Sequence, residues 1–272
     1  MDNKMVTNGL FILLLIVGAG GCSEDLAVQR PAEVSSKAPV EKAEPNSVEQ
    51  VLTQLKQKTE ELKLYQSEIE YLISQPLFES KTLRKGVLYY QKGEGKSALR
   101  INFETLKQDD EKTQKYAEHF IFDGVWLTHI DYQIKEVKRY QKAEPNEPVD
   151  AFELVSENFP IIGFSKVEDL KKEFEIRLIK QQGGGVKDFI QLHLKVKADS
   201  IYKDDYASID FWIDKQLYLP AKIIAVSTEE DIYEIKFLQP AINKKIDKKV
   251  FEVEVPKDFD APEIFELKKK TK

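Results

Sequence analysis

Few side chains in this sequence stand in an arrangement that could do chemistry. The three histidines, His119, His129 and His193, show no metal-ligand spacing, and no P-loop or Gly-x-Ser-x-Gly pattern occurs. The remaining reactive position is Cys22, the only cysteine. A single cysteine has no disulfide partner within the chain, so its thiol is available for another reaction such as acylation. We therefore predict that the protein is not an enzyme and has no catalytic residues, no metal site and no cofactor.

The residues before Cys22 predict export. Lys4 precedes an unbroken apolar run over residues 10–17, and small residues follow at 18–21. A charged start, a short apolar stretch and small residues before a cleavage site are typical of a secretory signal. The run is shorter than the stretch of about 20 apolar residues that a transmembrane helix needs. We therefore expect residues 1–21 to be a signal peptide whose cleavage leaves Cys22 as the first residue.

This arrangement resembles the lipobox of bacterial lipoproteins, whose cysteine receives a diacylglyceryl group before the signal is removed. Ala19 stands where the lipobox usually has leucine, and Ser23 follows the cysteine. By resemblance to Gram-negative sorting, a serine there favours the outer membrane, facing the periplasm, over the inner membrane. The resemblance thus implies a membrane anchor at lipidated Cys22. A plain signal peptide with a chance cysteine and an uncleaved signal anchor are the alternatives.

Composition limits the class of protein and its partners. The chain has 272 residues, with 42% hydrophobic and 32% charged residues, as in a soluble globular domain. Its net charge is −6, which the loss of Asp2 and Lys4 with the signal leaves unchanged. A mildly acidic chain lacks the positive surface that nucleic acid requires, so we expect no nucleic-acid partner. We also expect a monomer.

The rest of the chain divides into a tether and one domain. Residues 22–45 are rich in Pro, Ala, Ser, Glu and Lys and lack aromatics, which is typical of a flexible segment. Such a tether would reach roughly 25 Å from the membrane. The domain, residues 46–272, begins with an amphipathic helix over about 47–61, where Ser47 and Gln50 fit a capping box.

After this helix, apolar and polar residues alternate, which predicts strands. The clearest is 190–197, with Ile, Leu, Leu and Val on one face and Gln, His, Lys and Lys on the other. Asp123-Gly124 predicts a hairpin. Further strands are expected at 87–91, from Gly86 onward, and at 99–103, 120–122, 126–140, 174–178, 209–214, 233–237 and 251–255, and Gly183-Gly184-Gly185 predicts a turn. About ten half-buried strands at hairpin spacing indicate a mainly β (α+β) fold with one large antiparallel sheet.

The order of these segments, over about 47–267, resembles the bacterial outer-membrane lipoprotein carrier and acceptor family, the LolA/LolB-like fold. The matching stretches are Gly86-Val87-Leu88-Tyr89-Tyr90, Arg100–Phe103, Phe122–Leu127, Asp214–Pro220, and Asn243–Asp247 with Phe251 and Pro256. The resemblance implies an incomplete, curved antiparallel barrel with short lid helices over an apolar cavity. That cavity would shield acyl chains of lipoproteins or other lipids, and the anchored layout is closer to the acceptor type. Residues 91–96 lack the Arg-Pro pair with which the family latches its lid.

The resemblance and the alternation together give the candidate site residues. Residues 150–170 interrupt the strand pattern with apolar side chains, so the lid is expected there, at Phe152, Phe159, Ile162 and Phe164. The strand residues expected to line the cavity are Ile101, Phe103, Phe120, Phe122, Trp126, Ile130, Leu192, Leu194, Phe211, Ile213, Tyr233, Ile235 and Phe237. Each could equally be an ordinary core residue.

Three functions are compatible with these features. A carrier or acceptor would bind acyl chains in a cavity that opens to solvent. A periplasmic sensor or binding module would use the same cavity to regulate a partner protein. A structural envelope lipoprotein would have its cavity filled by its own side chains.

Overall fold

The computed structural model describes residues 47–151, 167–179 and 188–267. The predicted signal peptide, Cys22, the tether, the lid residues Phe152, Phe159, Ile162 and Phe164, and the turn at 183–185 lie outside these ranges, so each stays a prediction.

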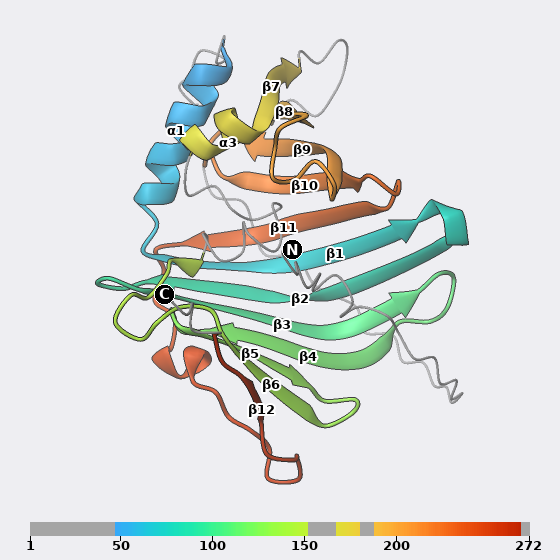
Figure 1. The fold of residues 1–272 in the computed structure, drawn as a ribbon, viewed down its shortest axis with the longest axis vertical. Helices are drawn as coiled ribbons and strands as arrows, with labels where there is room; N and C mark the ends of the chain where they lie inside the picture. The colour runs from blue at the N-terminus through green and yellow to red at the C-terminus, as the bar shows by residue number, and fades with distance from the viewer. Residues whose placement is uncertain (1–46, 152–166, 180–187, 268–272) are drawn as a thin grey trace, which may run out of the picture. The chain divides into compact units, whose positions relative to one another are not determined.

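The described residues form one sheet of twelve strands (Figure 1). Its strands are β1 (Leu64–Gln75), β2 (Ser80–Lys92), β3 (Ser97–Gln108), β4 (Gln114–Phe122), β5 (Trp126–Asp131), β6 (Glu136–Gln141), β7 (Phe174–Ile179), β8 (Phe189–Val196), β9 (Tyr206–Asp214), β10 (Pro220–Ser227), β11 (Ile232–Ile242) and β12 (Glu263–Phe265). The strand order is β12-β6-β5-β4-β3-β2-β1-β11-β10-β9-β8-β7. Every pair is antiparallel except β12 with β6, which is parallel.

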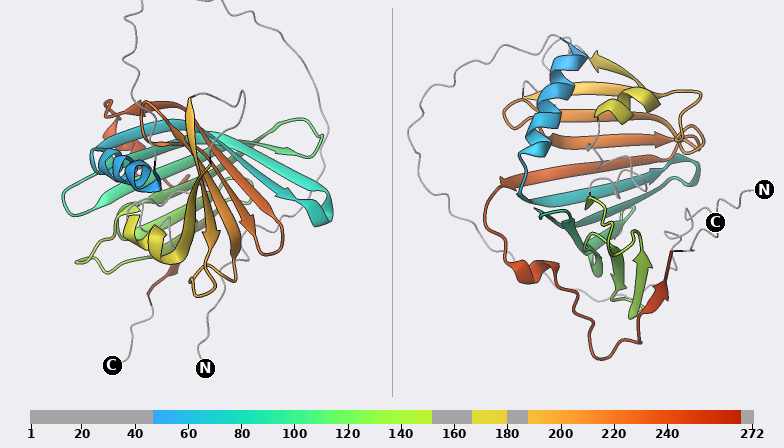
Figure 2. Two further views of the ribbon diagram at one scale, coloured as in Figure 1. Left: turned by 90° about the horizontal axis from the view of Figure 1, so that it is seen from above. Right: turned by 60° about the vertical axis from the view of Figure 1, so that its left-hand side comes forward.

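The sheet is curved and open. Strand direction turns progressively from one side to the other (Figure 2), as expected for strands with a right-handed twist. β12 and β7 form its two edges and do not pair with each other. The prediction of a mainly β fold built on one large, curved, antiparallel sheet is therefore confirmed.

Four short helical segments accompany the sheet within the described ranges: α1 (Val48–Glu60), α3 (Val167–Glu173), and the 3-10 turns η1 (Pro76–Phe78) and η2 (Lys248–Phe251). The predicted N-terminal helix is confirmed as α1. The Ser47 hydroxyl oxygen accepts a hydrogen bond from the backbone N–H of Gln50 at 3.2 Å, which caps the helix. Its apolar stripe, Val51, Leu52 and Leu55, is fully buried against the concave face of the sheet.

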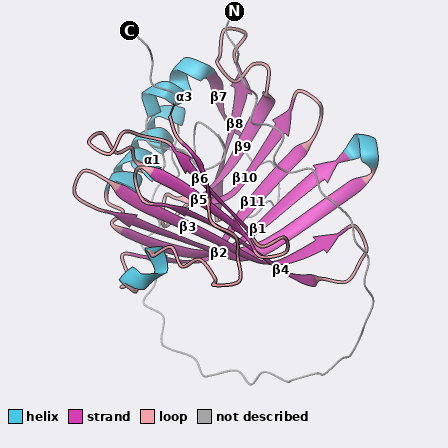
Figure 3. Cartoon of the chain, turned by 60° about the horizontal axis from the view of Figure 1, so that its bottom comes forward, coloured by secondary structure: helices cyan, strands magenta, loops and turns pink. Residues whose placement is uncertain are grey.

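The convex face carries a second, smaller apolar cluster. Ile121, Ile130 and Val137 pack there with Tyr132 and with Phe259 from the C-terminal segment. We call residues 244–262, which lead from β11 past this cluster to β12, the C-terminal strap. Figure 3 shows the sheet with the segments that pack on it.

Two predicted strands are wrong in their extent. The stretch 126–140 is two strands, because the chain reverses between β5 and β6 and Lys135 adopts a left-handed φ of 56°. The stretch 251–255 forms no strand, because η2 ends at Phe251 and the next residues lie in the strap. Apolar and polar residues alternate in this stretch although it does not pair with a neighbouring strand. The backbone carbonyls of Val250 and Glu252 instead accept hydrogen bonds from the Arg100 side chain.

Gly86 lies in the middle of β2, although the sequence placed the start of a strand there. The register between β2 and β3 shifts at Lys85/Gly86, and the two backbones approach closely. A Cβ atom on Gly86 would lie 1.8 Å from the carbonyl oxygen of Asn102. Glycine is needed here because no side chain fits between the two strands.

We predict that Gly86→Ala lowers the free energy of unfolding by about 2 kcal/mol or more, since the β2 and β3 backbones must move apart. Urea unfolding followed by circular dichroism measures the loss. The control is Lys81→Ala at an exposed position of the same strand, for which we expect a change within about 0.5 kcal/mol. Equal losses in both variants would contradict the close approach.

Candidate functional site

The concave face of the sheet is the largest apolar surface of the described residues. Directly paired residues of antiparallel strands point to the same face. The register pairs Ile101 with Phe120 and Leu192 with Phe211. On this face lie eleven of the predicted lining residues: Ile101, Phe103, Phe120, Phe122, Leu192, Leu194, Phe211, Ile213, Tyr233, Ile235 and Phe237.

Trp126 and Ile130 lie on the opposite, convex face, so we correct this part of the sequence interpretation. Leu127 pairs with Phe122, and His129 pairs with Phe120, which places the even-numbered residues of β5 on the other side. Ile130 is fully buried in the convex cluster. The alternation misled here because the C-terminal strap covers this part of the convex face, so an apolar residue such as Ile130 is buried there, whereas His129 and Asp131 lie on the concave face.

One half of the concave face, formed by β7–β11, is filled by apolar side chains beneath α1. Leu194, Ile213 and Ile223 have no exposed surface. Tight packing of this kind resembles an ordinary protein core and leaves little space for a guest.

The other half of the face, on β1–β5, has a buried ionic network that the sequence analysis missed. Arg84 Nη1 donates to Glu118 Oε2 at 2.5 Å, and His129 Nε2 lies 2.8 Å from Glu118 Oε1. All three side chains are buried. The guanidinium also lies over the rings of Phe103 and Tyr116, 5.9 and 5.4 Å from their centroids, and Phe120 stacks on the His129 ring at 4.5 Å.

The strand register contained a signal for this network. Arg84 has the same parity in β2 as the buried Leu88 and Tyr90, and Glu118 has the same parity in β4 as Phe120 and Phe122. Opposite charges on the apolar faces of β2 and β4, which lie on either side of β3, therefore indicate a buried ion pair.

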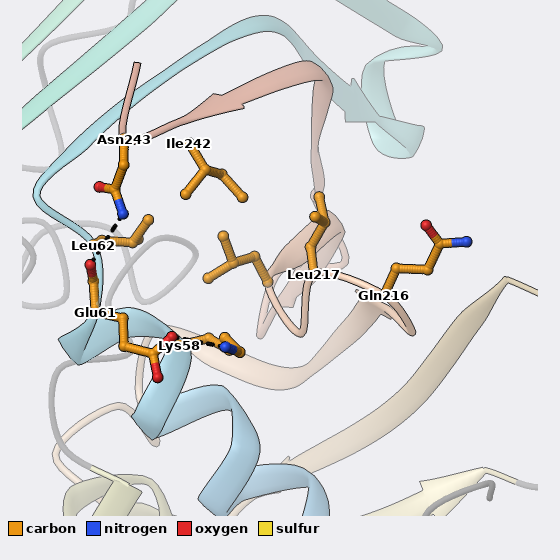
Figure 4. A pocket seen from close by; sticks show the side chains of 8 residues that line it. Lys58, Glu61, Leu62, Gln216, Leu217, Ile242 and Asn243 are labelled. Carbon is orange, nitrogen blue, oxygen red and sulfur yellow. Dashed lines mark hydrogen bonds and ion pairs between the residues drawn. The ribbon is translucent and has the colours of Figure 1, made fainter. Parts of the chain in front are cut away.

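Two hollows of the described residues lie beside the sheet's covering segments. The first, of about 180 Å³, lies between the end of α1 and the β9–β10 turn (Figure 4). Leu62, Leu217, Leu219 and Ile242 supply its apolar wall, while Lys58, Glu61, Gln216 and Asn243 supply polar groups. The second, of about 560 Å³, lies under the C-terminal strap against Tyr89, Arg100 and Tyr132 and has several charged side chains.

Arg100 binds the C-terminal strap to the convex face. Its Nη1 donates to the carbonyl oxygens of Val250 and Glu252 at 2.8 and 3.2 Å, and its Nη2 lies 3.1 Å from His119 Nδ1. Burial, together with the charge of Arg100, lowers the pKa of His119 from 6.5 to about 4. The imidazole is therefore neutral at pH 7 and Nδ1 can accept the guanidinium hydrogen bond.

The chain on either side of residues 152–166 is fixed to the concave core. Before this segment, Ala151 is fully buried, and its N–H donates to Ser97 Oγ at 2.6 Å. The Tyr90 hydroxyl donates to Asp150 Oδ2 at 3.3 Å. After the segment, Leu170 of α3 is buried in the same core.

Neither a metal site nor a membrane-spanning helix is found in the part of the chain that the structure describes. No three His, Cys, Asp or Glu side chains gather there in a way that could hold an ion. No helix within the described ranges has the length and apolarity to cross a bilayer.

Comparisons with known proteins do not assign a family. No protein-family model matches the chain, and no curated protein matches it. An uncharacterized conserved protein from Thermus thermophilus aligns at 9% identity and a TM-score of 0.46, over 80% of this chain and 98% of its own. A putative outer membrane lipoprotein-sorting protein domain from Vibrio parahaemolyticus aligns at 13% identity and a TM-score of 0.39, over 74% and 94%.

A further solved structure, the Pseudomonas aeruginosa MucA/MucB complex, aligns at 11% identity and a TM-score of 0.42, over 75% of this chain and 60% of that chain. Because every one of these TM-scores is below 0.5, we draw no conclusion from them. The family remains a resemblance carried by the sequence.

We predict that Glu118→Ala lowers the free energy of unfolding by about 3–5 kcal/mol, because Arg84 and His129 would keep their buried positions without the carboxylate between them. Urea unfolding at pH 7 measures this loss. The matched control replaces all three residues, as Arg84→Met, Glu118→Leu and His129→Leu. It should be close to the parent protein in stability. A loss below about 1 kcal/mol for Glu118→Ala would mean that the ion pair is solvated.

His119 should make stability depend on pH. The unfolded chain takes up a proton near pH 6.5, whereas the folded chain does so only near pH 4. The contribution of His119 to the free energy of unfolding is therefore fully present above about pH 6.5. It falls as the pH drops toward 4, by at most about 1.4 kcal/mol per pH unit. Unfolding of the parent and of His119→Asn, measured across this range, isolates the effect. Identical slopes for the two proteins would refute it.

Proposed function

We propose that this chain is an envelope protein that binds acyl chains, of lipids or of lipoproteins, against the concave face of its sheet. It would act as a carrier or acceptor anchored to the outer membrane, on its periplasmic side, through lipidated Cys22. The observation that carries the proposal is the apolar layer that runs across neighbouring strands of a curved sheet whose edges remain open.

The energetics of acyl chains favour such a surface. Each CH₂ group removed from water contributes about 0.8 kcal/mol, so a long acyl chain in water is unfavourable by more than about 10 kcal/mol. A carrier therefore needs an apolar surface of matching length. Aromatic side chains provide large contact area with few rotatable bonds, and Phe120, Phe103 and Tyr71 lie together on the β1–β5 half of the concave face.

This half is the better location for a guest. Ile101 and Phe120 retain some exposure, whereas the α1 half is filled. The residues on both sides of 152–166 contact the concave core, which supports the proposal that this apolar segment acts as a lid over the face. Phe152, Phe159, Ile162 and Phe164 would then touch the acyl chain.

A second candidate function is favoured by the packing beneath α1. Leu194, Ile213 and Ile223 have no exposed surface, and the hollow beside the end of α1 is only about 180 Å³. A structural envelope lipoprotein needs no larger space, whereas an acyl-chain carrier must open one.

We predict that Phe120→Gln weakens the binding of a fluorescent fatty acid by about 10-fold, because an amide replaces an aromatic ring on the concave face. Trp126→Gln is the matched control, since Trp126 is an aromatic residue of similar exposure on the convex face. We expect its affinity to change by less than about twofold. Fluorescence titration gives both affinities, and thermal unfolding of both variants accounts for lost stability.

The same preparation separates the two candidate functions. Protein lacking residues 1–22 and purified under native conditions should retain lipid that mass spectrometry detects. If no lipid copurifies and neither the parent protein nor the variants bind the fatty acid, the structural role is the correct one.

A further inference from the structure

The turn between β1 and β2 exposes two consecutive large apolar side chains. Leu77 is 83% exposed and Phe78 is 70% exposed, more than any other large hydrophobic side chain of the described ranges. Both lie in η1 at the end of the hairpin, which extends beyond its neighbours in Figure 3. Isolated exposed leucines are common, but an adjacent Leu-Phe pair at the tip of a hairpin needs an explanation.

The conformation of this tip is fixed by its own residues. Pro76 opens the turn and has no N–H to satisfy, and the N–H of Glu79 donates to the Pro76 carbonyl at 3.1 Å. Glu79 takes a left-handed φ of 49° that returns the chain into β2. Close by in β2, the Lys81 N–H donates to Asp109 Oδ1 of the next turn. Leu77 and Phe78 are thus held outward by a structured turn.

From this geometry we propose that the β1–β2 tip inserts Leu77 and Phe78 into the headgroup region of a phospholipid bilayer and so orients the domain on the membrane. Moving two such side chains out of water favours the inserted state by roughly 100-fold. That contribution is too weak to hold a protein on a membrane alone, because stable attachment takes two signals. A lipid anchor at Cys22 would supply the other.

The shape and the charge of the tip favour a bilayer over a protein partner. A stable protein interface buries about 800 Å² on each partner, far more than two side chains on a projecting turn offer. A bilayer accepts such a projection without a complementary pocket. The neighbouring turn contains Asp109, Asp110 and Glu111, so anionic lipids would repel this end of the sheet. The tip therefore suits a bilayer of zwitterionic phospholipids.

The chain that precedes the domain would allow this orientation. Residues 22–46 lie ahead of α1, and a flexible segment of this length spans roughly 25–30 Å. A domain held within that distance meets the bilayer at high effective concentration, so a weak insertion can decide which end faces the lipid. The inference rests on the membrane anchor of the proposed function but not on acyl-chain binding by the concave face.

The test uses the full lipidated chain, reconstituted into phosphatidylcholine vesicles, with Leu77→Cys. A membrane-impermeant maleimide should label this cysteine about 10-fold more slowly in vesicles than in detergent, because the inserted state hides the thiol. Phe78→Ser added to Leu77→Cys should restore the faster rate. Glu94→Cys, in the exposed β2–β3 turn at the opposite end of the strands, is the control and should label equally fast in both.

Three results would overturn the inference: equal labelling of Leu77→Cys in vesicles and detergent, equal protection of Glu94→Cys, or protection that appears only when envelope proteins are added. The last result would indicate a protein partner instead. The mass of the Cys22 peptide reports the anchor, and fatty-acid titration reports the concave face. If the mass shows no acyl group, the same labelling is measured after adding the chain to vesicles from outside. A missing anchor, a concave face that binds no fatty acid and a tip that does not insert are thereby distinguished.

Discussion

The ladder between β1 and β11 is the constraint on which the rest of the structure depends. It pairs residues more than 150 positions apart, from Tyr65 with Ile242 to Ser74 with Ile232, and it is the contact that joins the meander β1–β6 to the meander β7–β11. Asn243 fixes its end, because its Oδ1 accepts from the N–H groups of Lys63 and Leu64, and its Nδ2 donates to the Glu61 carbonyl. Without this junction the two halves of the concave face, on β7–β11 and on β1–β5, would belong to separate sheets.

Much of this fold could be predicted from local patterns. The strand β8 and the helix α1 follow from their periodicities, and the β4–β5 hairpin follows from Asp123-Gly124, where Gly124 adopts a φ of 100°. The β1–β11 pairing could not be predicted, since nothing in either strand specifies a partner so distant in sequence. The faces of Trp126 and Ile130 were misassigned for a similar reason, because the strap that buries the convex side of β5 comes from the far end of the chain.

The two halves of the concave face balance stability and specificity differently. Aliphatic packing beneath α1 contributes free energy without dictating a unique arrangement. The Arg84–Glu118–His129 network adds little net stability, because desolvation offsets most of the attraction, but a shift of register would separate its members. We infer that these charges help to fix how β2, β4 and β5 align. They also place a polar group at the floor of an otherwise apolar surface.

The parallel pairing of β12 with β6 has a consequence for assembly. An exposed strand edge can recruit strands from other molecules, and natural sheets blunt it with very short strands. After crossing the convex side, the strap ends in the three-residue β12 against β6, with Phe265 stacked on Tyr140 at 4.8 Å. The outer side of the six-residue β6 is thereby covered along three of its residues by the shorter β12. The two edges of the described sheet therefore differ, because β12 offers another polypeptide a ladder of three residues and β7 one of six.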